Sequence, residues 1–161
     1  MTSNAVSRPL SANPPVKPVY LIVVFALWLT GMAQLPIMKR YYIADAPGLG
    51  WLADFYTTHL IHYIGAALLL FILVYAAMVY WVVDRKRFKL TLLAMIRIVV
   101  ILGLVISGIF RVWKNLPDVV FAPGFILAID LVHLGLAMVI VLVGLFALIA
   151  RSRWLKERRR F

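Results

Sequence analysis

Four long apolar runs constrain this chain more than any other feature. They lie at roughly residues 19–37, 57–83, 90–112 and 124–150. A helix of about 20 apolar residues crosses the hydrocarbon core of a membrane, and each run is close to that length or longer. The chain is 65% hydrophobic with a mean hydropathy of +0.98, above the range of soluble domains. The runs predict an all-α membrane protein, a four-transmembrane-helix antiparallel bundle with short links.

The length of 161 residues suits one compact unit, so the bundle is expected over residues 18–150. Residues 1–17 are rich in Ser, Asn and Pro and predict a disordered arm. They lack a short apolar core followed by small residues, so they do not resemble a cleaved signal. Residues 151–161 form a basic tail.

Basic residues are distributed unevenly between the two ends of the predicted spans. Twelve lie on one side: Arg8, Lys17, Arg85, Lys86, Arg87, Lys89, Arg151, Arg153, Lys156, Arg158, Arg159 and Arg160. Four lie on the other: Lys39, Arg40, Arg111 and Lys114. Cytoplasmic segments carry the excess of Lys and Arg, so both termini are predicted in the cytoplasm. This topology explains the net charge of +11 without a nucleic-acid partner.

The chain contains no cysteine. This excludes thiolate metal sites, iron–sulfur clusters held by this chain, and covalent c-type haem. No nucleophile converges with an acid–base pair anywhere in the sequence. An electron-transfer or structural subunit is therefore expected rather than a stand-alone enzyme.

Ionisable residues inside apolar runs are costly and are candidates for function. The three histidines, His59, His62 and His133, all lie in the outward halves of the second and fourth runs. Asp130 and Arg97 are two further ionisable candidates inside the runs. Two neutral imidazoles can hold a b-type haem without covalent attachment. Interhelical hydrogen bonding by the same histidines is the simpler alternative.

Depth in the membrane favours His62 with His133 as haem and metal ligands. At 1.5 Å per residue, His62 lies roughly 9 Å and His133 roughly 14 Å from the outer ends of their runs. His59 is shallower by about 4.5 Å and remains the reserve ligand, or a partner for a haem propionate or a quinone. Gly65, one turn after His62, leaves room for a flat macrocycle, although ordinary helix packing also uses such residues.

Three polar residues near the same depth have several possible roles. Asp130 precedes His133 by one turn, where it can orient the imidazole, relay a proton, or occupy a hydrated position at the boundary. Arg111 and Lys114 end the third run, where they can pair with haem propionates or extend to the interface. A zinc or copper site on the histidines is a further alternative.

Four short segments resemble the cytochrome b (gamma) subunit of membrane-bound formate dehydrogenases and the wider bacterial dihaem cytochrome b family. They are Thr30–Gly31, HYIG at 62–65, LVISGIFRVW at 104–113 and DLVHLGLA at 130–137. The resemblance covers about the whole bundle. It implies a multi-pass protein of the bacterial inner membrane, with His62 and His133 at the positions of the outer haem's ligands.

The same resemblance implies an inner haem, whose ligands would come from the first run and from near Ala147. The first run has no histidine, so one haem b is expected instead of two. The resemblance also implies a periplasmic partner with iron–sulfur or multihaem centres, and exchange of electrons with the quinone pool or another membrane subunit. Two alternatives stay open, a haem-free helical scaffold or assembly subunit and a metal-ion carrier using His59, His62 and His133.

Overall fold

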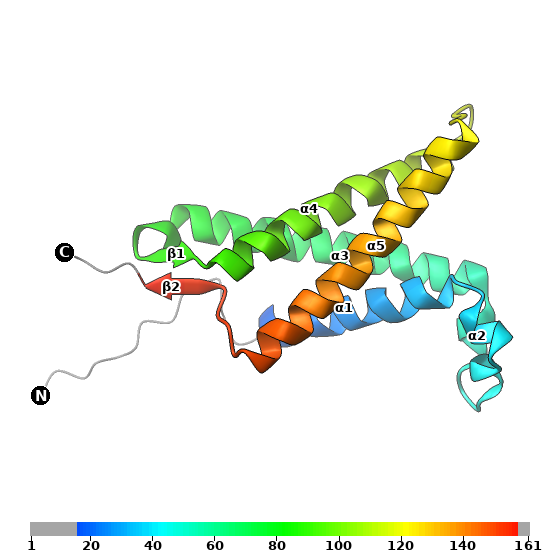
Figure 1. Ribbon diagram of the computed structural model, residues 1–161, viewed down its shortest axis with the longest axis horizontal. Helices are drawn as coiled ribbons and strands as arrows, with labels where there is room; N and C mark the ends of the chain where they lie inside the picture. The colour runs from blue at the N-terminus through cyan, green and yellow to red at the C-terminus, as the bar shows by residue number, and fades with distance from the viewer. Residues whose placement is uncertain (1–15, 158–161) are drawn as a thin grey trace, which may run out of the picture. The chain divides into compact units, whose positions relative to one another are not determined.

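The computed structural model describes residues 16–157, and it is mostly helical (Figure 1). The elements in chain order are α1 (Val16–Ala33), α2 (Ile37–Arg40), η2 (Ile43–Asp45), η3 (Gly50–Ala53), α3 (Phe55–Val82), η4 (Asp84–Lys86), β1 (Phe88–Leu90), α4 (Leu92–Trp113), α5 (Pro123–Ile149) and β2 (Leu155–Glu157).

Four of the helices, α1, α3, α4 and α5, are long and apolar enough to cross a membrane. This confirms the four long apolar helices that the sequence predicts. Most side chains on these helices are exposed on the surface of the chain, and large apolar residues dominate that surface. Such a surface suits contact with membrane lipid, because water would solvate it poorly.

The first helix begins and ends earlier than the sequence predicts. It was expected over 19–37, but α1 ends at Ala33 and a separate short helix, α2, begins at Ile37. Pro36 explains the break, because proline lacks a backbone N–H and restricts the residue before it. At the other end, α1 already includes residues 16 and 17, which were expected in the disordered arm. Residues 1–15 lie outside the described part.

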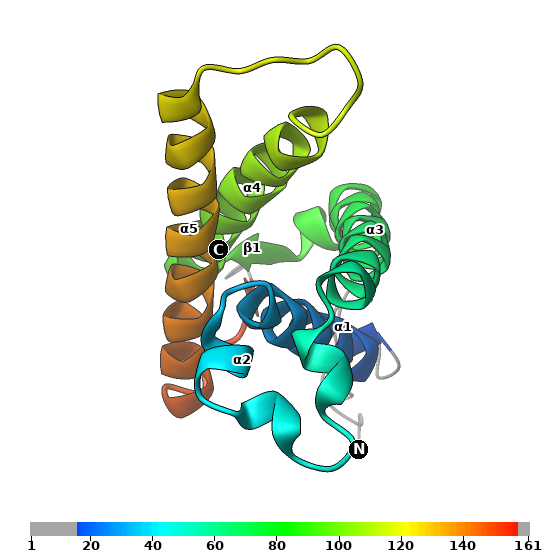
Figure 2. The same ribbon diagram turned by 90° about the vertical axis from the view of Figure 1, so that its right-hand side faces the viewer.

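The chain divides into two units, residues 1–86 and 87–161. Unit 1 pairs α1 with α3, and unit 2 pairs α4 with α5. Each pair is an antiparallel helical hairpin, because the end of the first helix contacts the start of the second. Figure 2 shows the linker over residues 114–122 that joins α4 to α5. We call this end of each hairpin its linker end. The single four-helix bundle stays a prediction.

The linker of unit 1, residues 34–54, folds back over the end of its hairpin. Leu52 in η3 is 2% exposed, and η3 contacts both α1 and α3. Asp54 begins α3, because its carboxylate accepts the backbone N–H of Tyr56. Tyr42 and Tyr56 stay exposed. The linker therefore caps the hairpin.

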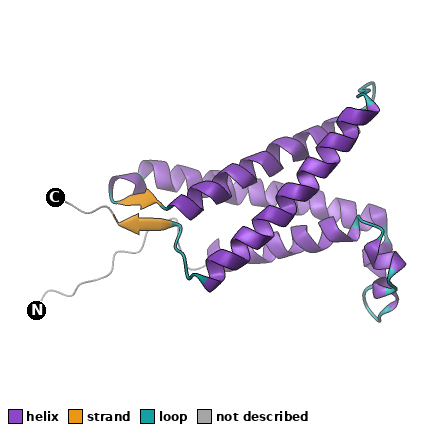
Figure 3. Cartoon of the chain, viewed as in Figure 1, coloured by secondary structure: helices purple, strands orange, loops and turns teal. Residues whose placement is uncertain are grey.

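The open end of unit 2 is closed by a short β-ribbon that the sequence did not predict. The strands β1 and β2 pair antiparallel (Figure 3). The expected basic tail over 151–161 therefore includes a strand, and residues 158–161 lie outside the described part.

Candidate imidazole sites

Three cross-helix pairs line the linker end of unit 1. Nδ1 of His62 on α3 lies 3.0 Å from Oγ1 of Thr30 on α1. One turn closer to the linker, Nδ1 of His59 lies 3.4 Å from Oε1 of Gln34. One turn further from the linker, Leu27 packs against Gly65. The polar groups of α3 therefore find partners on the neighbouring helix.

Unit 2 repeats this arrangement with different residues. Nδ1 of His133 on α5 lies 2.9 Å from Oγ of Ser107 on α4. Closer to the linker, the carboxylate of Asp130 pairs with Arg111 at 3.0 Å and with Lys114 at 2.8 Å. Further from the linker, Gly103 of α4 lies against Leu136 of α5.

The two sets of pairs correspond in sequence spacing. Gln34 follows Thr30 by four residues, as Arg111 follows Ser107. His59 precedes His62 by three residues, as Asp130 precedes His133. The third pair in each unit is a glycine with a leucine, but the two residue types are exchanged between the helices. The glycine lies on the second helix of unit 1 and on the first helix of unit 2. The two hairpins are therefore built on one plan, with one imidazole–hydroxyl pair in each.

Hydrogen bonding assigns the proton on each of these imidazoles. The Thr30 hydroxyl lies 2.7 Å from the carbonyl oxygen of Ala26, which can only accept, so the single hydroxyl hydrogen is donated there. Towards His62 the hydroxyl then accepts, and Nδ1 of the imidazole donates. Ser107 donates in the same way to the carbonyl oxygen of Gly103, 2.8 Å away, and accepts from His133. When each ring is neutral, this arrangement leaves the lone pair on Nε2, and a ring nitrogen with a lone pair is the atom that binds a metal.

A glycine beside each hydroxyl brings the imidazole close to the neighbouring helix. A Cβ atom on Gly31 would lie 3.3 Å from Cε1 of His62, and one on Gly108 would lie 3.6 Å from Cε1 of His133. The hydroxyl residues are buried, with Thr30 at 1% and Ser107 at 6% exposure, whereas both imidazoles are half-buried. Each unit therefore fixes the ring from one side and leaves part of it at the surface of the chain.

His59 has a different environment from His62. Its ring stacks on Phe55 with centroids 5.1 Å apart and lies 4.2 Å from the Tyr63 ring. The structure thus gives His62 and His133 matching partners, and gives His59 a separate aromatic setting. Gly65 contacts Leu27 of α1, because its missing side chain admits that leucine; room for a macrocycle beside Gly65 stays a prediction.

Arg111, predicted to pair with a haem propionate, binds Asp130. Asp130 pairs with two cations at once, so the cluster of Arg111, Lys114 and Asp130 carries one net positive charge. The sequence alone suggested that Asp130 could orient an imidazole or relay a proton. In the structure its carboxylate forms ion pairs with Arg111 and Lys114.

Thr30 and Ser107 are the site residues that sequence reasoning missed. Their hydroxyl–glycine dipeptides, Thr30–Gly31 and Ser107–Gly108, were noticed only within the motifs of the family resemblance. The available signal was their recurrence near the end of the first helix of each hairpin. Within residues 16–157, no group of three His, Asp or Glu side chains gathers as a metal site. A bis-histidine site needs only two ligands.

Comparison of the chain with protein-family models, with characterised proteins and with solved structures finds no match.

Proposed function

We propose that this protein is a membrane-anchoring b-type cytochrome subunit in which Nε2 of His62 and Nε2 of His133 bind the iron of one haem. The observation that carries the proposal is the repeated imidazole–hydroxyl pair. Two histidines, one per hairpin, have the same protonated nitrogen and the same glycine neighbour. Two such imidazoles could hold the iron of one b-type haem without covalent attachment.

The residues around the imidazoles fit such a group. The hydroxyls of Thr30 and Ser107 orient the rings and keep Nε2 basic, as outer partners of metal-bound histidines commonly do. The apolar helices exclude water from the ligands and so influence the redox potential. When bound, haem supplies one-electron chemistry, and the chain holds and tunes it.

The cationic cluster of Arg111, Lys114 and Asp130 lies one turn from His133, towards the linker. The net positive charge of this cluster would stabilise an anionic haem propionate. Arg111 and Lys114 would then contact both the propionate and the carboxylate of Asp130. His59, beside Gln34, is the other candidate for such a role.

The resemblance to the gamma subunit of formate dehydrogenases supplies the wider proposal. The chain would lie in the bacterial inner membrane with both termini in the cytoplasm. It would pass electrons between a periplasmic redox subunit, with iron–sulfur or multihaem centres, and the quinone pool or another membrane subunit. With no histidine in α1 and alanine at position 147, the second haem of that family has no ligands here.

The second candidate is a haem-free scaffold or assembly subunit. The same imidazole–hydroxyl bonds favour it, because hydrogen bonds between helices stabilise membrane hairpins without any cofactor. A metal-ion carrier using His59, His62 and His133 gains no support beyond the residue types.

A reduced-minus-oxidised visible spectrum of the purified protein separates the candidates. A b-type haem signal is expected in the natural chain and in His59→Ala, and it should be absent from His62→Ala and His133→Ala. Helical content by circular dichroism shows that each variant has folded. A signal lost in His59→Ala but kept in His62→Ala would move the ligand to His59. If the natural chain, expressed with its neighbouring subunits, folds without haem, the result supports the scaffold candidate.

A further inference from the structure

The β-ribbon of unit 2 has two chemically different faces. In its register Leu90 pairs with Leu155, Phe88 with Glu157, and Lys89 with Lys156. Phe88 is buried at 7% exposure, whereas Lys89 and Lys156 are both exposed. Side chains directly opposite each other lie on the same face of a ribbon. The two lysines therefore share the outer face, and the apolar residues share the inner one.

The ribbon is fixed to the start of α4. Thr91 donates its hydroxyl hydrogen to the carbonyl oxygen of Arg153 at 2.9 Å, and its backbone N–H to that of Trp154 at 3.1 Å. The guanidinium of Arg97 on α4 lies 4.8 Å from the centroid of the Trp154 ring. These contacts connect the returning chain to the first turns of α4.

The end of α5 directs the chain into this position. Arg151 has a left-handed φ of 49°, and the N–H groups of Arg151 and Ser152 donate to the carbonyl oxygens of Leu148 and Ala147. This is the Schellman ending of a helix, in which glycine usually occupies the left-handed position. The ribbon therefore has a defined place, with β2 six to eight residues beyond the end of α5 and β1 directly before α4.

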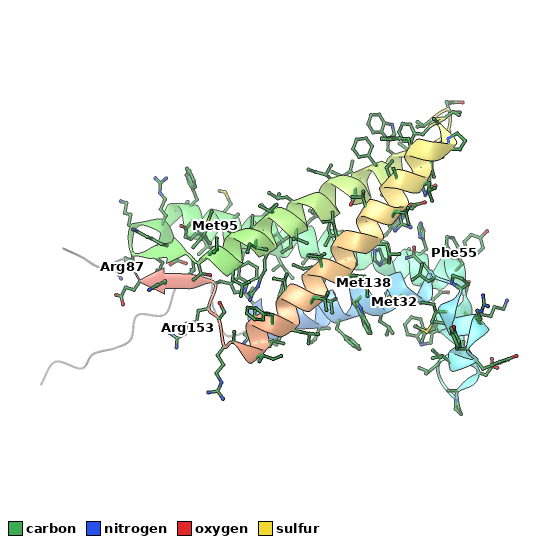
Figure 4. All side chains as sticks on the ribbon, viewed as in Figure 1. Met32, Phe55, Arg87, Met95, Met138 and Arg153 are labelled. Carbon is green, nitrogen blue, oxygen red and sulfur yellow. The ribbon has the colours of Figure 1, made fainter. Side chains whose placement is uncertain are left out.

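Like charges directly opposite on a ribbon repel each other. Residues 87–97 and 151–157, which form this end of unit 2, contain six cations, Arg87, Lys89, Arg97, Arg151, Arg153 and Lys156, and one carboxylate, Glu157. Arg87 and Arg153 both lie at this end (Figure 4). An anion between Lys89 and Lys156 would turn their repulsion into two attractive contacts.

We propose that Lys89 and Lys156 bind the phosphate of an anionic phospholipid at the surface of the membrane. The ribbon's position selects lipid as the source of the phosphate. The strand β1 ends two residues before α4, and β2 begins six residues after α5, so the lysine face lies beside the ends of two candidate spans, at headgroup level. Each basic residue near an anionic membrane surface contributes about 1 kcal/mol to binding.

The test uses the full chain in nanodiscs of phosphatidylcholine with and without phosphatidylglycerol. The readouts are the thermal midpoint and the phosphatidylglycerol retained in native mass spectrometry. Phosphatidylglycerol is expected to raise the midpoint of the natural chain. Lys89→Gln/Lys156→Gln should lose that rise and retain this lipid roughly 30-fold more weakly, the equivalent of two basic contacts. Lys39→Gln/Arg40→Gln removes the same charge from exposed α2 residues and should behave as the natural chain.

The variant Lys89→Glu guards against a simple folding failure. It places opposite charges across the ribbon, so it should keep the fold while losing the dependence on phosphatidylglycerol. An equal rise with inorganic phosphate in neutral nanodiscs would assign the lysines to a soluble anion and overturn the lipid proposal. Equal loss of lipid in the α2 control would also overturn it, because net charge alone would then explain binding.

Discussion

At the residue scale, two buried hydroxyls decide which nitrogen of each imidazole carries a proton. The hydroxyl groups of Thr30 and Ser107 each have one hydrogen, and each donates it to a backbone carbonyl oxygen of its own helix. That leaves only an accepting role towards His62 and His133. A hydroxyl on the neighbouring helix thus controls the chemistry of the proposed ligand, because the position of the proton determines which ring nitrogen is basic.

Replacing Thr30 by valine keeps the shape of the side chain but removes the hydroxyl. We expect the midpoint potential of the haem to rise, because an imidazole that loses its Nδ1 acceptor donates less electron density to iron. The loss of one hydrogen bond, about 1 kcal/mol, corresponds to about 40 mV for a one-electron couple. Redox potentiometry measures the shift, and ¹⁵N NMR of the haem-free protein measures the His62 tautomer.

Thr30→Ser keeps the hydroxyl and should restore both the potential and the tautomer. Thr58→Val provides the matched control. Thr58 is also buried, and its hydroxyl donates to the carbonyl oxygens of Asp54 and Phe55 on its own helix. A shift of equal size in Thr58→Val would show that the effect comes from packing alone.

Asp54, at the start of α3, gives a prediction about pH. The hydroxyl of Thr57 and backbone N–H groups donate to its carboxylate, and they lower the pKa of Asp54 below its ordinary value of 3.8. The cap therefore stabilises the first turn of α3 at any pH above the unfolded-state value, and this contribution is lost as the pH falls through the lowered one. Carbon-13 NMR of the carboxyl group should give a pKa below 3.8 that rises in Thr57→Ala. No rise in that variant would contradict the role of Thr57.

At the element scale, glycine sets how closely the helices of each hairpin approach. A Cβ atom on Gly103 would lie 2.8 Å from Cδ1 of Leu136, so Gly103→Ala forces that leucine to move. Overpacking costs about 1–3 kcal/mol, while a better helix propensity returns about 1 kcal/mol. We expect a net loss of stability in detergent. Denaturation monitored by circular dichroism measures this loss.

Two further variants make this measurement specific. Gly144→Ala, on α5, meets nothing within 4 Å and should gain stability from helix propensity alone. Adding Leu136→Ala to Gly103→Ala should remove the penalty for the added methyl group, apart from the cost of the cavity. Equal stability of the two single glycine variants would show that the close approach of α4 and α5 is unimportant.

The elements differ in how far the sequence predicts them. Length and hydropathy suffice for four long helices, and Pro36 explains the one boundary that was clearly wrong. The ribbon was missed because strands of three residues are too short to show a periodic pattern. The pair of Thr30 with His62 was missed because spacing along one helix does not reveal which residue of the next helix faces it. That register depends on how the linker folds.

At the scale of the whole molecule, the unequal charge at the two ends of the hairpins predicts the topology. In the sequence, twelve basic residues precede, separate or follow the two hairpins, and four fall in or beside their linkers. The translocation machinery retains the more basic segments in the cytoplasm. We therefore expect the linkers of both hairpins outside the cytoplasm and the β-ribbon inside it. The proposed exchange of electrons with a periplasmic partner depends on this orientation.

The absence of cysteine allows a direct test of the topology, because each introduced cysteine is the only thiol in the chain. In intact cells, a membrane-impermeant maleimide should label Asp45→Cys and Asn115→Cys in the two linkers. Ser152→Cys, before β2, should react only after the membrane is opened. If Ser152→Cys reacts first, both hairpins are inverted, and the imidazoles face a cytoplasmic electron partner. If the two linkers label from opposite sides, the hairpins insert in opposite orientations, and a haem shared by His62 and His133 near one face is ruled out.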